Sequence, residues 1–268
     1  MIPSPEVSVV IPVYDEQAIL YDAVAGLLER LAARGVSFEV VLAENGSRDG
    51  TLDVARELES RHPEVRHLSL PEPNYGKALK RGILAAHGAI VVADEIDLLD
   101  VDFHVEAVAR VRAGADLVIG SKLMAGARDQ RPLFRHLGSL VYTGLLRAAV
   151  GYSGTDTHGP KALDRARLLP IVEACRLDRD VFASELAVRA ARAGLSVVEL
   201  PLTIQEKRPP SVNLLRRVPA VLKNLAQLAY FTRRGSPHLD PPTALAGEPG
   251  QAAVGPDGDR SRDGLEQR

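Results

Sequence analysis

The sequence is short of the residues on which several classes of protein depend. Cys175 is the only cysteine among 268 residues, so the chain forms no internal disulfide and no zinc site built on several thiolates. Lys and Arg number 33 against 35 Asp and Glu, a formal net charge of −2. This balance argues against a general nucleic-acid binder, because affinity for a phosphate backbone needs a basic face.

Long apolar runs are also missing. No stretch reaches the roughly 18 uninterrupted apolar residues that a membrane-spanning helix needs. The first residues, MIPSPEVSVVIPV, carry no basic charge ahead of their apolar run, unlike a secretory signal peptide. We therefore expect a cytoplasmic protein, or one that is peripheral at the cytoplasmic face of a membrane.

The first half of the chain alternates short β-branched runs with longer amphipathic runs. The short runs predict strands at residues 7–13, 38–43, 65–70, 89–93 and 116–120. Apolar residues at helical spacing predict helices at residues 16–34, 49–61, 77–86 and 103–112. Strands that are apolar throughout are typical of sheets buried on both faces, so the sequence predicts an α/β fold with a mostly parallel sheet flanked by helices.

The second half is richer in helices. Its pattern predicts helices at residues 132–150, 164–174 and 181–193, a strand at 196–204, and a loop rich in Gly and Thr at 151–161. A basic, one-sided segment at 212–230 follows, and Pro219 predicts that its helix begins near Val218. From residue 235 onward the composition and the lack of periodicity predict a disordered tail.

Ligands of an open parallel sheet bind beyond the carboxyl ends of its strands. Polar residues follow each of the first four predicted strands, as Tyr14-Asp15-Glu16, Glu44-Asn45-Gly46-Ser47, Asn74-Tyr75-Gly76-Lys77 and Asp94-Glu95-Ile96-Asp97. None of these segments is the glycine-rich loop of a dehydrogenase or a Walker A motif, so the phosphates of a nucleotide need another partner. In extended backbone Glu95 and Asp97 project to the same side, where they can hold one Mg²⁺ or Mn²⁺.

These motifs together resemble a known family. VSVVIPVYDE, ENGSRDGT and NYGKALKRGILAAHGAIVVADEID resemble a family-2 glycosyltransferase of GT-A fold. GTDTHGPKALDR and DVFASELAVRAARAGLSVVELPLTIQEKR are similar to its dolichyl-phosphate-mannose synthase branch. The resemblance implies one GT-A domain over residues 1–234, with a nucleotide-binding half at about 1–121 and an acceptor half at about 122–234.

The resemblance also implies roles for individual residues. On the donor side, it implies that the nucleotide is bound by Pro12, Tyr14, Glu16, Glu44, Asn45, Lys77 and Asp94. It assigns the metal to Glu95 and Asp97, with Asp97 the carboxylate on which catalysis most depends, and Asp94 as the alternative if the loop carries one extra residue. On the acceptor side, it assigns a phosphate to Lys122, Arg135, Ser139, Lys161, Lys207 and Arg208.

The implied reaction is an inverting, metal-dependent transfer of a hexose from a GDP- or UDP-linked sugar to a polyprenyl phosphate. A phosphate acceptor is already an anion and needs no strong base. A soluble or glycan hydroxyl is an alternative acceptor, and it needs a base, for which Glu185 and Asp156 are the candidates. A second alternative is a non-catalytic partner subunit that binds nucleotide sugars. The basic segment at 212–234 predicts peripheral contact with an anionic membrane surface.

Overall fold

The computed structural model describes residues 5–129, 133–204 and 214–233. The chain divides into two compact units, Met1–His238 and Leu239–Arg268, and every described residue belongs to the first. No helix in this described part of the chain combines the length and the apolarity needed to cross a membrane.

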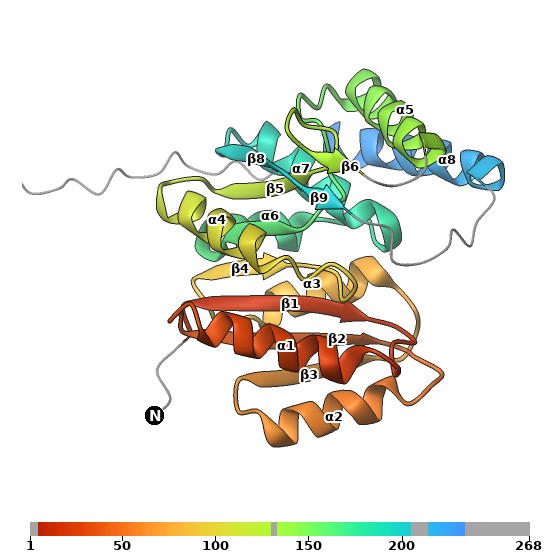
Figure 1. Ribbon diagram of the computed structural model, residues 1–268. Helices are drawn as coiled ribbons and strands as arrows, with labels where there is room; N and C mark the ends of the chain where they lie inside the picture. Colours follow the sequence, from red (N-terminus) through yellow and green to blue (C-terminus); the bar gives the residue numbers. More distant parts are fainter. Residues whose placement is uncertain (1–4, 130–132, 205–213, 234–268) are drawn as a thin grey trace, which may run out of the picture. The chain divides into compact units, whose positions relative to one another are not determined.

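A seven-stranded sheet forms the centre of the first unit (Figure 1). Its strands are β1 (Val7–Val13), β2 (Phe38–Asn45), β3 (Val65–Leu70), β4 (Ile90–Ala93), β5 (Leu117–Ser121), β7 (Lys161–Asp164) and β8 (Val197–Pro201). The spatial order is β3-β2-β1-β4-β7-β5-β8, and all neighbours are parallel except β7, which runs antiparallel to both β4 and β5. Two short strands, β6 (Arg128–Asp129) and β9 (Thr203–Ile204), pair separately.

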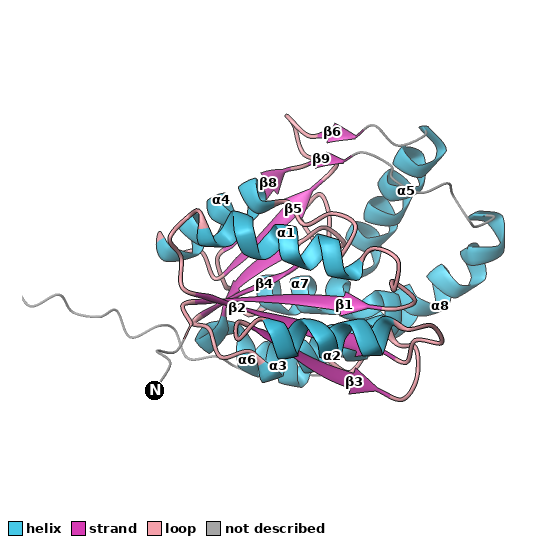
Figure 2. Ribbon diagram, turned by 60° about the horizontal axis from the view of Figure 1, so that its bottom comes forward, coloured by secondary structure: helices cyan, strands magenta, loops and turns pink. Residues whose placement is uncertain are grey.

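Helices cover the sheet (Figure 2). They are α1 (Leu20–Ala32), α2 (Thr51–Arg61), α3 (Tyr75–Ala85), α4 (Val101–Arg112), α5 (Leu133–Val150), α6 (Arg165–Ala174), the 3₁₀ turn η1 (Arg179–Val181), α7 (Phe182–Arg192) and α8 (Leu214–Arg233). Buried residues of α1, α2 and α4 share one hydrophobic cluster with β1, β2 and β4, while α3 contacts β1 and β2 and packs with α6 and α7. The apolar stripes of α1, α2, α3 and α4 are therefore buried.

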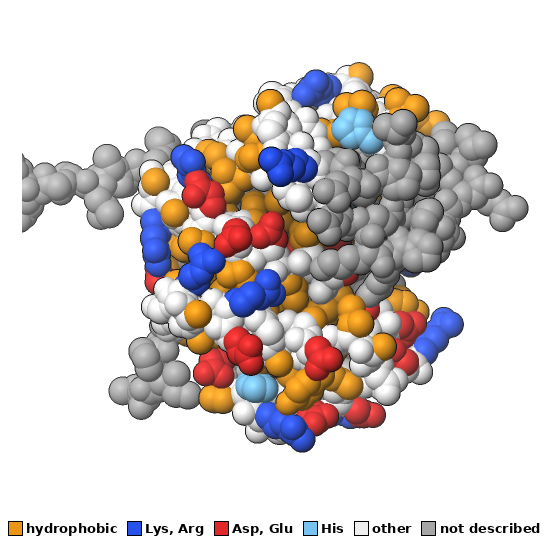
Figure 3. Space-filling model, in the orientation of Figure 1, with side chains coloured by type: hydrophobic (Ala, Val, Ile, Leu, Met, Phe, Trp, Pro, Cys, Tyr) orange, Lys and Arg blue, Asp and Glu red, His pale blue; other side chains and the backbone are white. Residues whose placement is uncertain are grey.

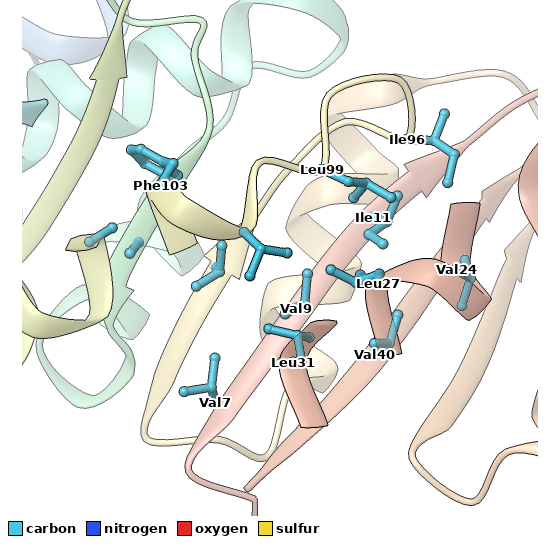
Figure 4. Close-up of a cluster of buried hydrophobic side chains, with 14 of the residues drawn as sticks. Val7, Val9, Ile11, Val24, Leu27, Leu31, Val40, Ile96, Leu99 and Phe103 are labelled. Atoms are coloured by element: carbon cyan, nitrogen blue, oxygen red, sulfur yellow. The ribbon is translucent and has the colours of Figure 1, made fainter. Parts of the chain in front are cut away.

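The hydrophobic cluster also anchors the loop after β4. Ile96 and Leu99 are 7% and 4% exposed and belong to this cluster, and Figure 4 shows Leu99 beside Ile11 of β1. Burial of these two side chains pins the backbone of the loop at both ends of Asp97. The acidic residues of the loop are thereby presented by a segment that the core holds in place.

The expected α/β architecture is confirmed, and the first five strands lie within one or two residues of their predicted ranges. Three expectations were wrong. Residues 161–164, expected as the end of a loop and the start of a helix, form β7. The strand expected at 196–204 is interrupted at Leu202, which is buried. Helix α8 begins at Leu214 and runs through Pro219, an exposed position where water can satisfy the carbonyl that the missing N–H leaves unpaired.

A polar cluster around Glu39 closes the end of the sheet opposite the carboxyl ends of β1 and β2. Its carboxylate accepts hydrogen bonds from Ser8 Oγ (2.6 Å), His87 N (2.7 Å) and Arg66 Nε (2.9 Å). The side chain is 8% exposed, and burial raises its pKa, but the bonds from Arg66, Ser8 and His87 outweigh burial, so the pKa is lowered. The ionised carboxylate therefore ties β1, β2, β3 and the turn before β4 together.

We predict that Glu39→Gln lowers the free energy of unfolding by about 1–3 kcal/mol at neutral pH, because it weakens charge-assisted bonds at a buried site. A carboxyl group whose folded pKa is lowered stabilises the protein above its unfolded pKa and loses this effect as pH falls through the folded pKa. Urea unfolding at neutral pH and well below pH 4.5, the ordinary pKa of Glu, should show the difference between wild type and variant shrinking in acid. A constant difference would contradict this account.

Candidate functional site

The loops after β1 and β2 interlock at the carboxyl edge of the sheet. Asp15, at a φ of 52°, donates its N–H to Ser47 Oγ (3.1 Å) and accepts from Arg48 N (2.7 Å). Glu16 N donates to Thr51 Oγ1 (2.8 Å). These bonds join the two loops into one ledge, formed by the residues that follow β1 and β2. The side chains of Tyr14 and Glu16 on this ledge are half-buried, and Pro12 is buried in β1.

Glu44 and Asn45 lie beneath this ledge. Glu44 is 2% exposed, and its two carboxylate oxygens accept from Ser47 N (2.6 Å) and from Ser69 Oγ. Asn45 is 5% exposed and accepts from Asn74 N through Oδ1 (2.5 Å). Both side chains therefore shape the loops that face the expected nucleotide.

Asn74 joins the third loop to the second half of the chain. Its Oδ1 accepts from Lys77 N (3.0 Å) and from Arg179 N (2.9 Å), and its Nδ2 donates to Asp178 (2.9 Å). The backbone of η1 lies so close that a Cβ at Gly76 would be 2.6 Å from Arg179 N, so only glycine fits there. Lys77 is exposed, with Nζ 3.9 Å from the Asp178 carboxylate.

The loop after β4 differs from the expected extended backbone. Leu98 N and Leu99 N both donate to Glu95 O, at 3.0 and 3.2 Å, so the chain turns tightly where extended backbone was expected to project Glu95 and Asp97 to the same side. Asp94 points into the protein, where its Oδ2 lies 2.6 Å from His104 Nε2 and its Oδ1 accepts from Glu95 N (2.8 Å). Asp94 therefore supports the turn from below.

Glu95 is the first residue of this turn. Its side chain is exposed, yet protein surrounds it closely enough that burial is the largest cause of the rise in its pKa to about 7. The carboxylates of Asp97 and Asp94 raise this pKa further, while Lys161 and Lys122 lower it. Acidic residues of the donor side and basic residues of the acceptor side thus both shift the pKa of the Glu95 carboxyl group.

The two lysines come from β7 and from the end of β5. Lys161 pairs in register with Ala93 on one side and Ile119 on the other, and it is 3% exposed. Burial lowers its pKa to about 8, against the opposing influence of Asp156 and Glu95. Lys122 Nζ lies 2.8 Å from Asp156 Oδ2. This places two cations beside the acidic turn.

Asp156 belongs to the loop between α5 and β7. Burial raises its pKa, but the charge and hydrogen bond of Lys122 and the N–H of His158 outweigh burial and leave the pKa lowered. Its Oδ1 accepts from Thr157 N (2.7 Å) and His158 N (3.0 Å). Glu199 of β8 holds the same loop by accepting from Thr155 N (2.6 Å) and Asp156 N (3.1 Å). Asp156 is therefore an ionised, fully engaged carboxylate.

Glu185 has no exposed surface. One carboxylate oxygen accepts from Arg189 Nε (2.7 Å), and the other accepts from Arg176 N (2.9 Å) and Leu177 N (2.6 Å). Arg189, 1% exposed, donates onward to Phe231 O of α8 (3.1 Å). The structure gives Glu185 the role of an internal anchor for α6, α7 and α8.

The remaining acceptor-side residues are less informative. Ser139 lies half-buried on α5. The side chain of Arg135, and Lys207 and Arg208 altogether, lie outside the described residues. The structure thus brings together Glu95, Asp97, Lys122, Asp156 and Lys161. Glu185 instead bonds to Arg189, Arg176 and Leu177.

Comparison with known proteins assigns the family. Residues 8–165 match the family model described as Glycosyl transferase family 2. The chain belongs to this family. AglD of Haloferax volcanii is 32% identical over 80% of this chain but only 35% of its own length. The dolichyl-phosphate beta-glucosyltransferase ALG5C of Trichomonas vaginalis is 26% identical over 84% of this chain and 71% of its own.

The fold also has solved counterparts. The structure of glucosyl-3-phosphoglycerate synthase from Mycobacterium tuberculosis, in complex with Mn²⁺, UDP and glucosyl-3-phosphoglycerate, superimposes with a TM-score of 0.60 at 22% identity. The match covers 83% of this chain and 80% of that chain. The family-2 domain therefore has the GT-A fold that its sequence motifs predicted.

Three residues that position the site were not found from the sequence of this glycosyltransferase. His104 holds Asp94, Glu199 holds the loop around Asp156, and Asn74 joins the two halves. The position of Asn74 immediately before a helix was a usable signal, because Asn is a preferred N-cap residue. Nothing in the local sequence marks His104 or Glu199, because their partners lie on other elements.

A divalent cation suits the acidic turn, although no cluster of three or more His, Cys, Asp or Glu side chains among the described residues forms a complete protein cage. Mg²⁺ and Mn²⁺ sites of nucleotide enzymes often use one or two carboxylates, with the remaining ligands from substrate phosphates and water. Burial is the largest cause of the raised pKa of Glu95, and repulsion from Asp97 and Asp94 adds to it; a cation would relieve that repulsion. The residues that would hold it are Glu95 and Asp97.

We predict that Glu95→Gln and Asp97→Asn each weaken binding of Mn²⁺ in the presence of a bound donor nucleotide by at least about tenfold. Titration calorimetry with Mn²⁺ measures the effect. Asp102→Asn is the matched control, because Asp102 is a nearby carboxylate that is 86% exposed and pairs with Arg34. Unchanged Mn²⁺ affinity in both turn variants would show that Glu95 and Asp97 do not bind the metal.

We predict that Glu185→Gln lowers the free energy of unfolding by about 3–5 kcal/mol, because it leaves the Arg189 guanidinium buried without its full partner. The matched control is Glu106→Gln, whose pair with Arg110 also spans one helical turn but is about half exposed, so its effect stays below about 1 kcal/mol. Denaturant unfolding gives both values. A Glu185→Gln protein with normal stability and no transfer activity would instead identify a catalytic carboxylate.

Proposed function

We propose that this protein transfers a hexose, with inversion, from a GDP- or UDP-linked sugar to a polyprenyl phosphate, using Mg²⁺ or Mn²⁺. The observation that carries the proposal is the position of two lysines beside the acidic turn of Glu95 and Asp97. Lys161 pairs in register with Ala93, just before the turn, and Lys122 follows β5, the strand on the other side of β7. A donor diphosphate with its metal suits the acidic pair. An anionic acceptor suits the lysine pair, since lysine is a recurrent ligand of phosphate.

The names of relatives point in the same direction. ALG5C is named as a dolichyl-phosphate glucosyltransferase, and the superimposed structure contains Mn²⁺ and UDP. Dolichyl phosphate is a polyprenol-type phosphate, and UDP is the leaving group of a UDP-sugar. These names support the donor and acceptor classes for this chain without deciding the sugar or the base.

Donor binding rests on the interlocked loops. The ledge formed by the loops after β1 and β2, with Tyr14, Glu16 and Lys77 on its accessible side, offers polar groups to a nucleoside. Glu44 and Asn45 fix its shape from below. When bound, the cation offsets the charge that develops on the departing diphosphate.

Neither candidate base on the acceptor side is available among the residues that the structure describes. Asp156 is 4% exposed with both oxygens engaged, and Glu185 is wholly buried in its pair with Arg189. A hydroxyl acceptor needs a carboxylate to take its proton, whereas a phosphate oxygen attacks the anomeric carbon as an anion. Lys122 and Lys161 orient that anion beside the donor, which favours a phosphate acceptor over a soluble or glycan hydroxyl.

Transfer of labelled sugar into an organic-extractable lipid tests the proposal. A panel of GDP- and UDP-sugars is incubated with Mn²⁺ and a polyprenyl phosphate, and we expect one donor to label the lipid. Lys161→Met should raise the KM for the polyprenyl phosphate by about tenfold to a hundredfold, because it removes one of the two positive charges beside the proposed phosphate site.

The outcomes separate the alternatives. Label found only in water-soluble product would identify a hydroxyl acceptor. Binding of a nucleotide sugar, seen as a rise in melting temperature, without transfer to any acceptor would identify a partner subunit. Lys80→Met is the control for Lys161→Met. Lys161 Nζ donates to Gly159 O (2.7 Å), and Lys80 Nζ likewise donates to the backbone carbonyls Glu173 O and Cys175 O, but Lys80 lies on α3.

A further inference from the structure

Three residues other than glycine adopt left-handed backbone in the part of the chain that the structure describes. They are Asp15, Leu99 and Arg179, with φ values of 52°, 41° and 50°. Such backbone is strained for a residue with a side chain, and it is found most often at functional sites. All three border the candidate site. Asp15 follows β1, Leu99 lies at the end of the acidic turn, and Arg179 N donates to Asn74 of the third loop (2.9 Å).

The side chains of Asp15 and Leu99 account for their own backbone. Asp15 Oδ1 accepts from Arg48 N (2.7 Å), a bond that joins the loops after β1 and β2. Leu99 is 4% exposed and belongs to the hydrophobic cluster that anchors its turn. Glycine would relieve the strain at either position but would lose these contacts. The protein itself therefore explains why neither position is a glycine.

The side chain of Arg179 has no such explanation within the protein. Arg179 is exposed, and its guanidinium forms no ion pair or hydrogen bond with any residue of the described ranges. Its backbone is held, because its N–H donates to Asn74 Oδ1 and because a Cβ at Gly76 would lie 2.6 Å from both its N and its O. Glycine at 179 would keep that hydrogen bond without strain. What arginine adds is a positive charge that no described residue uses.

The surroundings of Arg179 place this charge beside the loop after β3. The 3₁₀ turn η1 packs against α3, whose first turn carries Lys77. Asp178, the residue before Arg179, already has partners. Its Oδ2 accepts from Asn74 Nδ2 (2.9 Å) and lies 3.9 Å from Lys77 Nζ. Arg179 thus adds a second cation to the loop from which Lys77 is expected to reach the nucleotide.

The face drawn in Figure 3 supplies no uniform positive charge. Basic and acidic side chains are interspersed on it, and the whole chain has a net charge of −2. Individual side chains must therefore provide the attraction for a diphosphate on such a surface. Arginine suits this task, because its planar guanidinium can donate two parallel N–H groups to phosphate oxygens.

We propose that Arg179 binds the diphosphate of the nucleotide donor, beside Lys77. The inference rests on the proposed function for the class of donor, a nucleoside diphosphate sugar. The strained backbone holds the arginine at the loop after β3, and the diphosphate is the partner that the protein itself does not provide. Because the diphosphate gains negative charge as the sugar departs, its attraction to Arg179 increases during transfer. The family resemblance did not include this residue.

Binding of UDP and GDP to the whole protein tests this role without any transfer. Each nucleotide is titrated calorimetrically in the presence of Mn²⁺ and without an acceptor. Arg179→Met removes the charge, so it should weaken binding of whichever nucleotide the wild type binds by about tenfold to a hundredfold. Arg179→Lys should lose less affinity, because lysine keeps the charge but not the planar fork.

Arg179→Gly separates the side chain from the strained backbone. It should weaken nucleotide binding as much as Arg179→Met does, yet raise the melting temperature by about 1–3 °C, because glycine adopts positive φ without strain. Arg176→Met is the matched control, because Arg176 is an exposed arginine of the same segment. Its guanidinium lies 6.0 Å from the ring centroid of Phe231, on α8. This control should bind the nucleotide like wild type.

The outcomes separate this role from the proposed function. Wild-type nucleotide affinity in both Arg179→Met and Arg179→Gly would overturn the role and leave the proposed transfer intact, and so would an equal loss in Arg176→Met. A lower melting temperature in Arg179→Gly would overturn the argument from strain. A wild type that binds neither nucleotide would overturn the proposed donor class, and this role with it. A wild type that binds a nucleotide but transfers no sugar would overturn the transfer alone.

Discussion

Insertion of β7 between β4 and β5 is the constraint on which the site depends. This short strand runs against its neighbours and sets Lys161 between Ala93 and Ile119, directly beside the residues that follow β4. A buried ammonium ion is costly unless anions compensate it. Asp156, Glu95 and Asp94 supply that compensation, as their opposing effect on the lowered pKa of Lys161 records. The acidic and basic halves of the site therefore stabilise each other before any substrate is present.

The surroundings of each carboxylate in this protein, rather than its sequence motif, determine whether it has a structural role or is accessible to a ligand. Asp94, Glu185 and Glu44 sit in motifs that the family resemblance linked to substrate, and each is buried with its oxygens held by protein donors. Glu95 is accessible and carries a raised pKa. A buried carboxylate whose oxygens are all hydrogen-bonded holds the surrounding backbone in place. An accessible carboxylate with a raised pKa is suited to bind a cation.

An element of this fold can be predicted when its own residues determine it, and not when partners elsewhere in the chain do. Strands β1 to β5 are apolar runs, so their own residues predict them. Strand β7 is four residues long and begins with a lysine, and only its neighbours in space make it a strand. Glu95 and Asp97 were predicted from their place after a strand, whereas Lys122, Asp156 and Lys161 were predicted from the family resemblance. His104 and Glu199 were missed because each acts through a partner far along the chain or on another element.

The position of β7 also constrains the order in which the chain can assemble. Strands β4 and β5 are not neighbours, and the sheet stays in two pieces until residues 161–164 fill the gap between them. During synthesis, β1 to β4 can pair as they emerge from the ribosome. Strand β5 can pair with β7 only after about forty more residues have been made, and such non-local pairing is slow. A ribosome-bound chain that ends before β7 therefore leaves one edge of β4 open and β5 without either of its neighbours, and we expect chaperones to bind at that stage.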